Sequence, residues 1–265
     1  MKRLAVIGHP VAHSRSPAMH TAALADLGLS DEWSYEAIDI IEHGFTRLVG
    51  AMPDNGYVGA NITVPHKEAA LKCSHQATDV ASAIGAANTL IFSPAGTVAD
   101  NTDAPGLIDA LPGPVAGKKA LVFGAGGAAR AVLWALLAEG AEVTVWNRTP
   151  ERAERLVADL GGVAETDPDA SAFDLLVNSS AAGLGGGDGL AELPVEASQI
   201  GSGQVVVDMV YGDGPGSLLD AATAAGAETV DGLEILVRQG ARSLEIWTGL
   251  EPSLDVMRRA ARGDA

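Results

Sequence analysis

The stretch ALVFGAGGAAR, residues 120–130, runs from a short apolar segment into a glycine-rich turn and then into an alanine-rich segment. This order predicts a buried strand, a tight turn and a helix. Gly124, Gly126 and Gly127 allow the backbone to approach a pyrophosphate, and the following helix N-terminus offers N–H groups to it. Ala129 takes the third position of the fingerprint, where a small residue suffices. The stretch therefore indicates a Rossmann-like dinucleotide-binding fold, and its alternative is a tight turn that binds nothing.

The stretch NRTPER follows the next predicted strand, about 20 residues further on, where an NAD-preferring site places Asp or Glu. Asn147 removes the anionic clash with a 2′-phosphate, and Arg148 and Arg152 supply charge-assisted donors. Thr149 can donate a hydroxyl or cap the helix that Pro150 begins. The pattern predicts NADP rather than NAD; the alternative is a capping threonine beside solvated arginines.

Length and charge narrow the class of protein. The chain has 265 residues, 47% of them apolar, which is enough for two modest domains with real cores. Asp and Glu outnumber Lys and Arg by 34 to 17, and the formal net charge is −17. A field of that sign repels nucleic acid and anionic membrane surfaces, so we expect neither as a partner. We expect a small-molecule ligand instead, held by a local group of cations and backbone donors.

Cys73 is the single cysteine, so no disulfide can form within the chain, and its neighbours lack the further ligands of a zinc site. We therefore expect no metal. The apolar run at the N-terminus is too short for a signal peptide, and no run of about 18 apolar residues occurs. These features predict a cytoplasmic protein, and they leave monomer and homodimer open.

Before the glycine turn, apolar periodicity predicts alternating strands and helices, which implies a mainly parallel sheet with helices on its faces. The strands are expected at 4–8, 33–39, 57–63 and 87–92, and the helices at 16–27, 42–51 and 65–72.

The segment LPGPVAGKK, residues 111–119, has the Pro and Gly content of a linker or domain boundary, and a second α/β pattern follows it. The strands are expected at 120–123, 142–146, 174–178 and 205–209, and the helices at 128–139, 150–160, 233–247 and 253–262.

The stretch NITVPHK, residues 61–67, carries chemically useful groups. In a strand, Asn61 and Thr63 point to the same side, and Pro65 suits the first turn of a helix. Lys67 would then emerge at a strand-to-helix junction, at the carboxyl end of a strand, where open α/β sheets bind their ligands. The alternative is a capped helix with an exposed lysine.

Other polar side chains fall at comparable strand ends. Ser14 and Ser16 follow the first strand, Asn88 lies in AANTL, and Asp103 ends DNTD before a helix. Each has an ordinary alternative, because serines serve in turns and caps, Asn88 can satisfy buried backbone, and Asp103 can cap a helix. Together they offer hydroxyls and amides to a polyol or carboxylate, and a Lys/Asp pair able to exchange a proton.

Taken together, these motifs resemble the shikimate dehydrogenase family over essentially the full chain. The matching stretches are GHPVAHSRSP (8–17), NITVPHK (61–67), GAANT (85–89), NTDAPG (101–106), GAGGAAR (124–130), NRT (147–149), DMVY (208–211) and GLEILVRQGA (232–241). The resemblance implies reversible reduction of 3-dehydroshikimate to shikimate with NADPH, on the route to aromatic amino acids.

The resemblance also implies roles for individual residues. Lys67 and Asp103 would form the catalytic pair. The substrate-binding residues would be Ser14 and Ser16, at the carboxylate, and Asn61, Thr63, Asn88 and Gln239, at the ring hydroxyls or the pocket wall. The cofactor-binding residues would be Gly124, Ala125, Gly126, Gly127, Ala128, Asn147, Arg148, Thr149, Arg152, Val210, Tyr211 and Gly232, the last three beside the nicotinamide.

Three stretches depart from the family's pattern. NSSAAG (178–183) has Ser180 in place of the usual threonine, and we expect little effect. GDGPGSLL (212–219) replaces a Pro-x-x-Thr segment, with Ser217 in the threonine's place, and we expect an altered loop. Ser243 and Leu244 replace Gln-Phe, which would change the pocket wall slightly.

We therefore predict an α/β protein of two domains with a cleft between them. Residues 1–104, completed by C-terminal helices within 234–265, would bind the substrate, and residues 105–233 would form the Rossmann-like NADP-binding domain. One alternative is a quinate/shikimate dehydrogenase that uses NAD, against which Ser16 and the NRT turn argue. Another is a catalytically silent NADP-binding regulator, which would have no chemical reason to keep Lys67 and Asp103.

Overall fold

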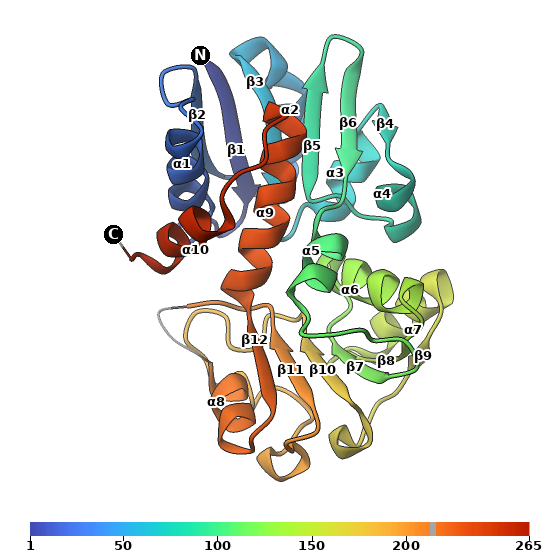
Figure 1. Cartoon of the computed structure of the whole chain (residues 1–265). Helices are drawn as coiled ribbons and strands as arrows, with labels where there is room; N and C mark the ends of the chain where they lie inside the picture. The colour runs from blue at the N-terminus through green and yellow to red at the C-terminus, as the bar shows by residue number, and fades with distance from the viewer. Residues whose placement is uncertain (213–215, 265) are drawn as a thin grey trace. The chain divides into compact units, whose positions relative to one another are not determined.

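The computed structural model describes residues 1–212 and 216–264 (Figure 1). Contacts within the chain separate two units, residues 1–106 with 236–265 and residues 107–235. Both boundaries fall inside helices, α5 (Asp103–Ala110) and α9 (Gly232–Thr248). Each unit has its own sheet with helices packed on it. No helix in the described part of the chain is both long and apolar enough to cross a membrane.

The first unit contains a six-stranded sheet in the order β2-β1-β3-β5-β6-β4. Its strands are β1 (Lys2–Gly8), β2 (Trp33–Asp39), β3 (Tyr57–Ile62), β4 (Gln76–Ala77), β5 (Thr89–Ser93) and β6 (Gly96–Asp100). Strand β1 runs parallel to β2 and β3, whereas β5 runs antiparallel to both β3 and β6. The sheet is therefore mixed, because β5 and β6 form a hairpin that the spacing of apolar residues does not reveal.

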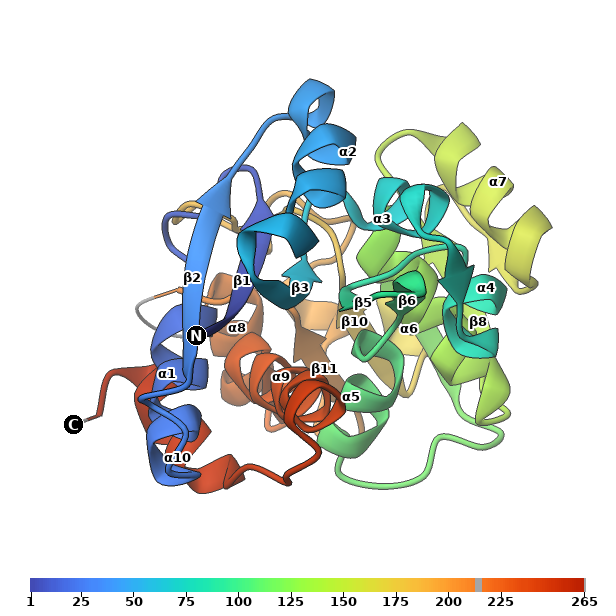
Figure 2. The ribbon, with the colours of Figure 1, turned by 90° about the horizontal axis from the view of Figure 1, so that it is seen from above.

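Helices cover both faces of this sheet. They are α1 (Ser16–Asp26), α2 (Glu42–Ala51), α3 (Lys67–Cys73), α4 (Asp79–Ile84) and the C-terminal part of α9, while α10 (Leu254–Arg262) packs on α1. Helices α2 and α3 bury their apolar side chains against Ile7, Ala60 and Ile62. Strand residues alternate between faces, so Gly59 points the other way, where its hydrogen faces the Trp247 indole of α9. Helices α1 and α10 pack side by side (Figure 2).

The second unit contains a parallel six-stranded sheet in the order β12-β11-β10-β7-β8-β9. Its strands are β7 (Lys119–Phe123), β8 (Glu142–Trp146), β9 (Val163–Ala164), β10 (Leu175–Asn178), β11 (Val205–Asp208) and β12 (Glu228–Asp231). The chain extends the sheet from β7 to one side through β8 and then to the other side through β10. Open α/β sheets bind ligands at such a reversal, beside the carboxyl ends of the strands.

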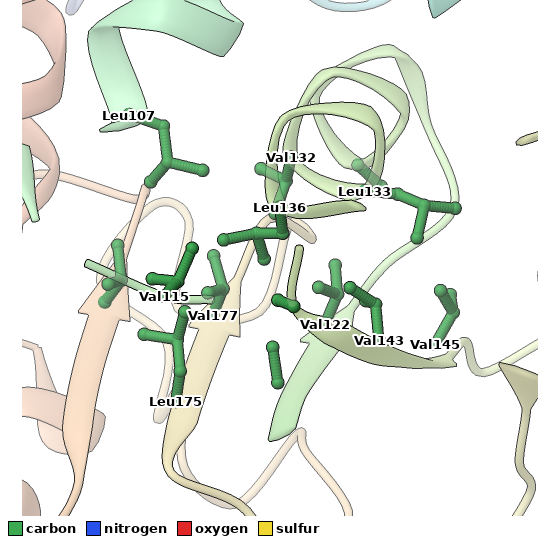
Figure 3. Packing of buried hydrophobic residues seen from close by; sticks show 14 of the residues in the cluster. Leu107, Val115, Val122, Val132, Leu133, Leu136, Val143, Val145, Leu175 and Val177 are labelled. Carbon is green, nitrogen blue, oxygen red and sulfur yellow. The ribbon is translucent and has the colours of Figure 1, made fainter. Parts of the chain in front are cut away.

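Helices α6 (Gly127–Ala138) and α7 (Pro150–Leu160) pack on one face of the second sheet, together with Leu107 of α5 and Ile235 of α9. Val132 and Leu136 of α6 lie over Val122 and Val177 (Figure 3). Val115 belongs to the same core, so residues 111–119 are part of this unit rather than a flexible linker. Helix α8 (Ser217–Ala224) covers the opposite face.

Most predicted elements are present, and β2, β8, α2 and α7 have the expected bounds. The elements missing from the prediction are α4, α8, β4, β6, β9 and β12. Two of them, β4 and β9, have only two residues each and are too short to show a period of apolar residues. Two details near NITVPHK were wrong: β3 ends at Ile62, before Thr63, and α3 begins at Lys67. Pro65 lies in the turn before that helix, where the N–H of His66 donates to the carbonyl of Thr63.

Candidate active site

Lys67 and Asp103 meet in the first unit, each as the first residue of a helix that follows a strand. The Nζ of Lys67 lies 2.6 Å from Oδ2 of Asp103, and the two side chains are 11% and 8% exposed. Little water therefore reaches the contact, and a charge-assisted hydrogen bond is stronger there than at the surface. Lys67 is not the exposed lysine of the alternative interpretation.

The carboxylate of Asp103 is available because another side chain caps helix α5. Oδ1 of Asn101 accepts hydrogen bonds from the N–H groups of Asp103 and Ala104, at 3.1 and 3.3 Å. The Nδ2 of Asn101 donates to the carbonyl of Ala86 at 2.9 Å, which fixes the amide. Asp103 thus does not cap the helix, and its charge lies at a helix N-terminus, where negative charge is favoured.

Asn88 joins Asp103 to helix α9. Its buried Nδ2 lies 2.9 Å from Oδ1 of Asp103 and 3.0 Å from Oε1 of Gln239, while its Oδ1 accepts from the N–H of Thr102 at 2.7 Å. Asn88 precedes β5, which runs antiparallel to β3. The start of β5 therefore lies at the same end of the sheet as the carboxyl ends of β3 and β6. The polar segments that adjoin these three strand ends are thereby brought together.

Helices α5 and α9 approach closely beside this network. A Cβ atom at Gly106 would lie only 2.9 Å from Cβ of Gln239 and 2.9 Å from its backbone nitrogen. The Nε2 of Gln239 donates to the carbonyl of Leu236 at 2.9 Å, so its Oε1 is turned toward Asn88. The glycine of NTDAPG therefore has a packing role: it admits α9 to the site.

Asn61, at the end of β3, is 4% exposed and lies in the same unit. The hydroxyl of Tyr35 donates to its Oδ1 at 2.8 Å, and its Nδ2 donates to Oγ of Ser243 at 2.9 Å. Thr89 and Thr102 complete this buried polar network. The sequence did not single out these last two or Tyr35 for the site, although both threonines lie within the quoted motifs.

Ser14 and Ser16 lie at the start of α1. Ser16 is buried, and its N–H donates to Oγ of Ser14 at 3.3 Å. Helix α1 has no side-chain cap, so neither hydroxyl serves as the helix cap of the alternative interpretation. The carbonyl of Ser16 accepts from Nδ1 of His20 at 2.9 Å, and the His20 ring stacks on Tyr35 with 4.1 Å between centroids. Thr63 is partly buried, and its Cγ2 fills the space beside Gly8.

In the second unit, the glycine turn lies where the strand order reverses. Gly124 has φ of +114°, and a Cβ there would lie 3.0 Å from the nitrogen of Ser180, so both conformation and space require glycine. A Cβ at Gly126 would meet nothing within 4 Å. Helix α6 begins at Gly127 with no side-chain cap and no acidic residue in its first turn. These residues fit a pyrophosphate, since the N–H groups of the first turn are open to an anion.

The NRT turn follows β8. The Nδ2 of Asn147 donates to the carbonyl of Thr149 at 2.8 Å, and Thr149 precedes α7 without capping it through its side chain. Arg148 and Arg152 are exposed, and neither forms an ion pair within residues 1–212 and 216–264. The turn therefore offers a free hydroxyl and two cations, which fits a 2′-phosphate.

Strands β10 and β11 end in a buried amide–carboxylate pair. The Nδ2 of Asn178 lies 2.9 Å from Oδ1 of Asp208, which also accepts from the N–H of Val210 at 3.0 Å. Burial raises the pKa of Asp208 to about 6. A Cβ at Gly232 would lie 2.6 Å from the carbonyl oxygen of Met209, so α9 can begin there only with glycine. Tyr211, the residue after Val210, is partly buried.

The two altered stretches of the second unit form side-chain hydrogen bonds. The hydroxyl of Ser180 donates to Oδ1 of Asn178 at 2.7 Å, so the missing methyl costs no hydrogen bond. Ser217 accepts from the N–H of Leu190 at 2.9 Å. Residues 213–215 of the altered loop lie outside the described residues.

A parallel sheet with an open glycine turn, together with a unit that buries a Lys/Asp pair among amides and hydroxyls, defines a nucleotide-dependent oxidoreductase of the Rossmann type. Comparison with family models identifies the family to which this chain belongs. Residues 6–90 match the shikimate dehydrogenase substrate-binding domain, residues 108–182 match shikimate/quinate 5-dehydrogenase, and residues 232–262 match the shikimate 5'-dehydrogenase C-terminal domain. The chain belongs to the shikimate dehydrogenase family.

Individual relatives agree over almost the whole length. Shikimate dehydrogenase (NADP(+)) of Methanocella arvoryzae is 43% identical, over 97% of this chain and 97% of the relative. That of Mesorhizobium japonicum is 40% identical, over 98% and 95%. The crystal structure of shikimate 5-dehydrogenase from Thermus thermophilus, in complex with NADP(H) and shikimate, is 42% identical, with a TM-score of 0.90 over 100% of both chains. The predicted family, fold class and cofactor are confirmed.

Proposed function

We propose that Lys67 and Asp103 are the catalytic pair of this enzyme. The chain is an oxidoreductase that interconverts 3-dehydroshikimate and shikimate with NADP, in the shikimate pathway. The observation that carries the proposal is the buried contact of 2.6 Å between the lysine ammonium and the carboxylate. A charged pair that lies at the ends of the strands, among amides and hydroxyls, is suited to proton exchange with a bound polyol.

Bound NADPH supplies the hydride that reduces the ketone of 3-dehydroshikimate. Negative charge then develops on the ketone oxygen, and the ammonium of Lys67 stabilises that charge and donates a proton to the oxygen. Asp103 holds the ammonium in place through Oδ2, while its Oδ1 is fixed by Asn88. In the reverse direction the neutral amine of Lys67 accepts the proton of the substrate hydroxyl.

The remaining substrate-binding roles follow the chemistry of the side chains. Ser14 and Ser16 offer hydroxyls to the carboxylate of shikimate at the start of α1. Asn61, Asn88 and Gln239 supply amides for the ring hydroxyls, and their burial leaves little competing water. Thr63 would line the pocket beyond the end of β3.

The cofactor-binding roles follow the second unit. Its glycine turn, residues 124–128, would hold the pyrophosphate, and Asn147, Arg148, Thr149 and Arg152 would hold the 2′-phosphate. Val210, Tyr211 and Gly232 would border the nicotinamide. A cytoplasmic location and the absence of a nucleic-acid partner remain predictions from sequence.

Steady-state oxidation kinetics test the assignment, with shikimate and quinate each combined with NADP and NAD. We expect the highest kcat/KM for shikimate with NADP. A preference for quinate would contradict the assignment of Ser14 and Ser16, and a preference for NAD would contradict that of the NRT turn. Inactivity in all four combinations would favour a silent NADP-binding regulator, and binding of NADP measured by titration would then identify it.

A further inference from the structure

The side-chain amide of Asn61 is held by the protein at both ends. Tyr35 donates to its Oδ1 at 2.8 Å, and its Nδ2 donates to Oγ of Ser243 at 2.9 Å. Tyr35 is 8% exposed, Asn61 4% and Ser243 0%. Each of these hydrogen bonds is therefore made away from water, where an unpaired polar group would be costly.

The surrounding groups favour one orientation of this amide. Its Nδ2 also faces the carbonyl oxygen of Asn88 at 3.4 Å, and the hydroxyl of Ser243 donates its proton to the carbonyl of Gln239 at 3.0 Å. A flipped amide would place Oδ1 against one carbonyl oxygen and against a hydroxyl that has no second proton to give. This arrangement favours Nδ2 of Asn61 toward Ser243 and Oδ1 toward Tyr35.

Ser243 also connects Asn61 to the residues around the Lys/Asp pair. Its Oγ lies 2.9 Å from Oγ1 of Thr89 and 3.0 Å from Oγ1 of Thr102. Both threonine hydroxyls lie within 3.2 Å of Oδ1 of Asn88. Ser243 is thus a branch point between the amide of Asn61 and that of Asn88.

We propose that Tyr35 and Ser243 are positioning residues that orient Asn61 toward a ring hydroxyl of the substrate. The inference rests on the proposed substrate role of Asn61. With Tyr35 on one lone pair of Oδ1, the second lone pair remains for a hydroxyl proton of shikimate, so Asn61 acts as an acceptor. Neither Tyr35 nor Ser243 needs to touch the substrate.

The test compares the single variants Tyr35→Phe, Ser243→Ala and Asn61→Ala. It also includes two double variants, in which Tyr35→Phe or Ser243→Ala is combined with Asn61→Ala. We expect Tyr35→Phe and Ser243→Ala each to raise KM for shikimate by about three- to tenfold, the range of one lost hydrogen bond. The KM for NADP should stay unchanged, and kcat should fall by less than KM rises. In the double variants, adding either change to Asn61→Ala should raise KM no further, because both act through that amide.

Thr248→Val is the matched control. Thr248 lies on the same helix and its hydroxyl donates to the carbonyl of Leu244 at 2.8 Å, as that of Ser243 does to Gln239, but it lies outside the Asn61 network. Tyr35→Phe keeps the ring that stacks on His20, so it tests the inference even if Ser243→Ala fails to fold.

Two results would overturn the inference in different ways. If Asn61→Ala leaves KM for shikimate unchanged, the proposed role of Asn61 is wrong and the inference falls with it. If Asn61→Ala raises KM while Tyr35→Phe and Ser243→Ala behave like Thr248→Val, or if the double variants multiply the single effects, only the positioning role is wrong.

Discussion

The Nζ of Lys67 lies 2.6 Å from Oδ2 of Asp103, although 36 positions separate the two residues in the sequence. Lys67 follows β3 and Asp103 follows β6, and the carboxyl ends of these two strands lie at the same end of the sheet. Asn101 leaves the carboxylate available by capping α5 in its place. The fold thus brings the Lys67 ammonium and the Asp103 carboxylate into contact.

Lys67→Ala should lower kcat by about 100-fold or more, because the variant lacks the cation and proton donor at the developing charge. Affinity for NADP should remain nearly unchanged, since the proposed cofactor-binding residues lie in the other unit. Steady-state kinetics and NADP titration measure the two effects. Lys72→Ala, on the same helix, is the control and should retain activity. An equal loss of NADP affinity in Lys67→Ala would contradict the catalytic assignment.

Arg148→Ala should raise KM for NADP by about tenfold or more, which corresponds to one lost hydrogen bond to a charged group. The KM for NAD, which has no 2′-phosphate, should change little. Arg155→Ala is the control: it removes an exposed cation from α7 and should change the KM for neither NADP nor NAD. A uniform loss with both cofactors would show that Arg148 does not bind the 2′-phosphate.

Gly106→Ala should destabilise the protein by about 1–3 kcal/mol, because the new methyl would meet the backbone of Gln239 in a packed site. It should also lower activity by displacing the Gln239 amide. Chemical denaturation and kinetics measure both effects. Gly113→Ala is the control, since a Cβ there meets nothing within 4 Å. Equal stability of the two variants would mean that α5 and α9 can separate at no cost.

His20 should make stability depend on pH. Burial lowers its pKa from 6.5 to about 4, so between these values the folded chain binds fewer protons than the unfolded chain. Its contribution is therefore present above about pH 6.5 and is lost as the pH falls toward 4. His20→Phe keeps a ring against Tyr35 without a titratable group.

The measurement is the free energy of unfolding by urea at several pH values. We expect a shallower pH dependence in His20→Phe than in the wild type between about pH 4 and 6.5. His13→Asn, which changes an exposed histidine, should keep the wild-type slope. Equal slopes in all three proteins would mean that His20 titrates alike in the folded and unfolded states.

The sequence predicted the individual elements of the two units about equally well. In the second unit, where the glycine turn has its own signature, β7, α6, β8 and α7 were expected within a residue of their bounds, and in the first unit α1, β2 and α2 were expected as closely. The first unit contains the β5–β6 hairpin, whose direction depends on pairing with β3 rather than on local periodicity. Pairing between distant strands cannot be read from spacing alone.

The individual motifs of the substrate site were visible in the sequence, but their connections were not. Asn88 and Asp103 lie in quoted motifs, whereas Tyr35 lies in β2, outside all of them. Its bond to Asn61 spans 26 positions, and that of Ser243 spans 182. Such contacts follow from tertiary packing.

The β5–β6 hairpin has a consequence for how this chain tolerates changes in length. Its turn, around Pro94 and Ala95, is exposed and lies at the end of the strands opposite to Asn88 and Asp103 (Figure 1). Extra residues inserted at the turn would loop outward and leave the strand pairing intact. A single residue inserted inside β5 would shift its register against β3 and displace Asn88. The turn is thus a place for a peptide tag or a reporter, whereas the strands beside it allow no insertion.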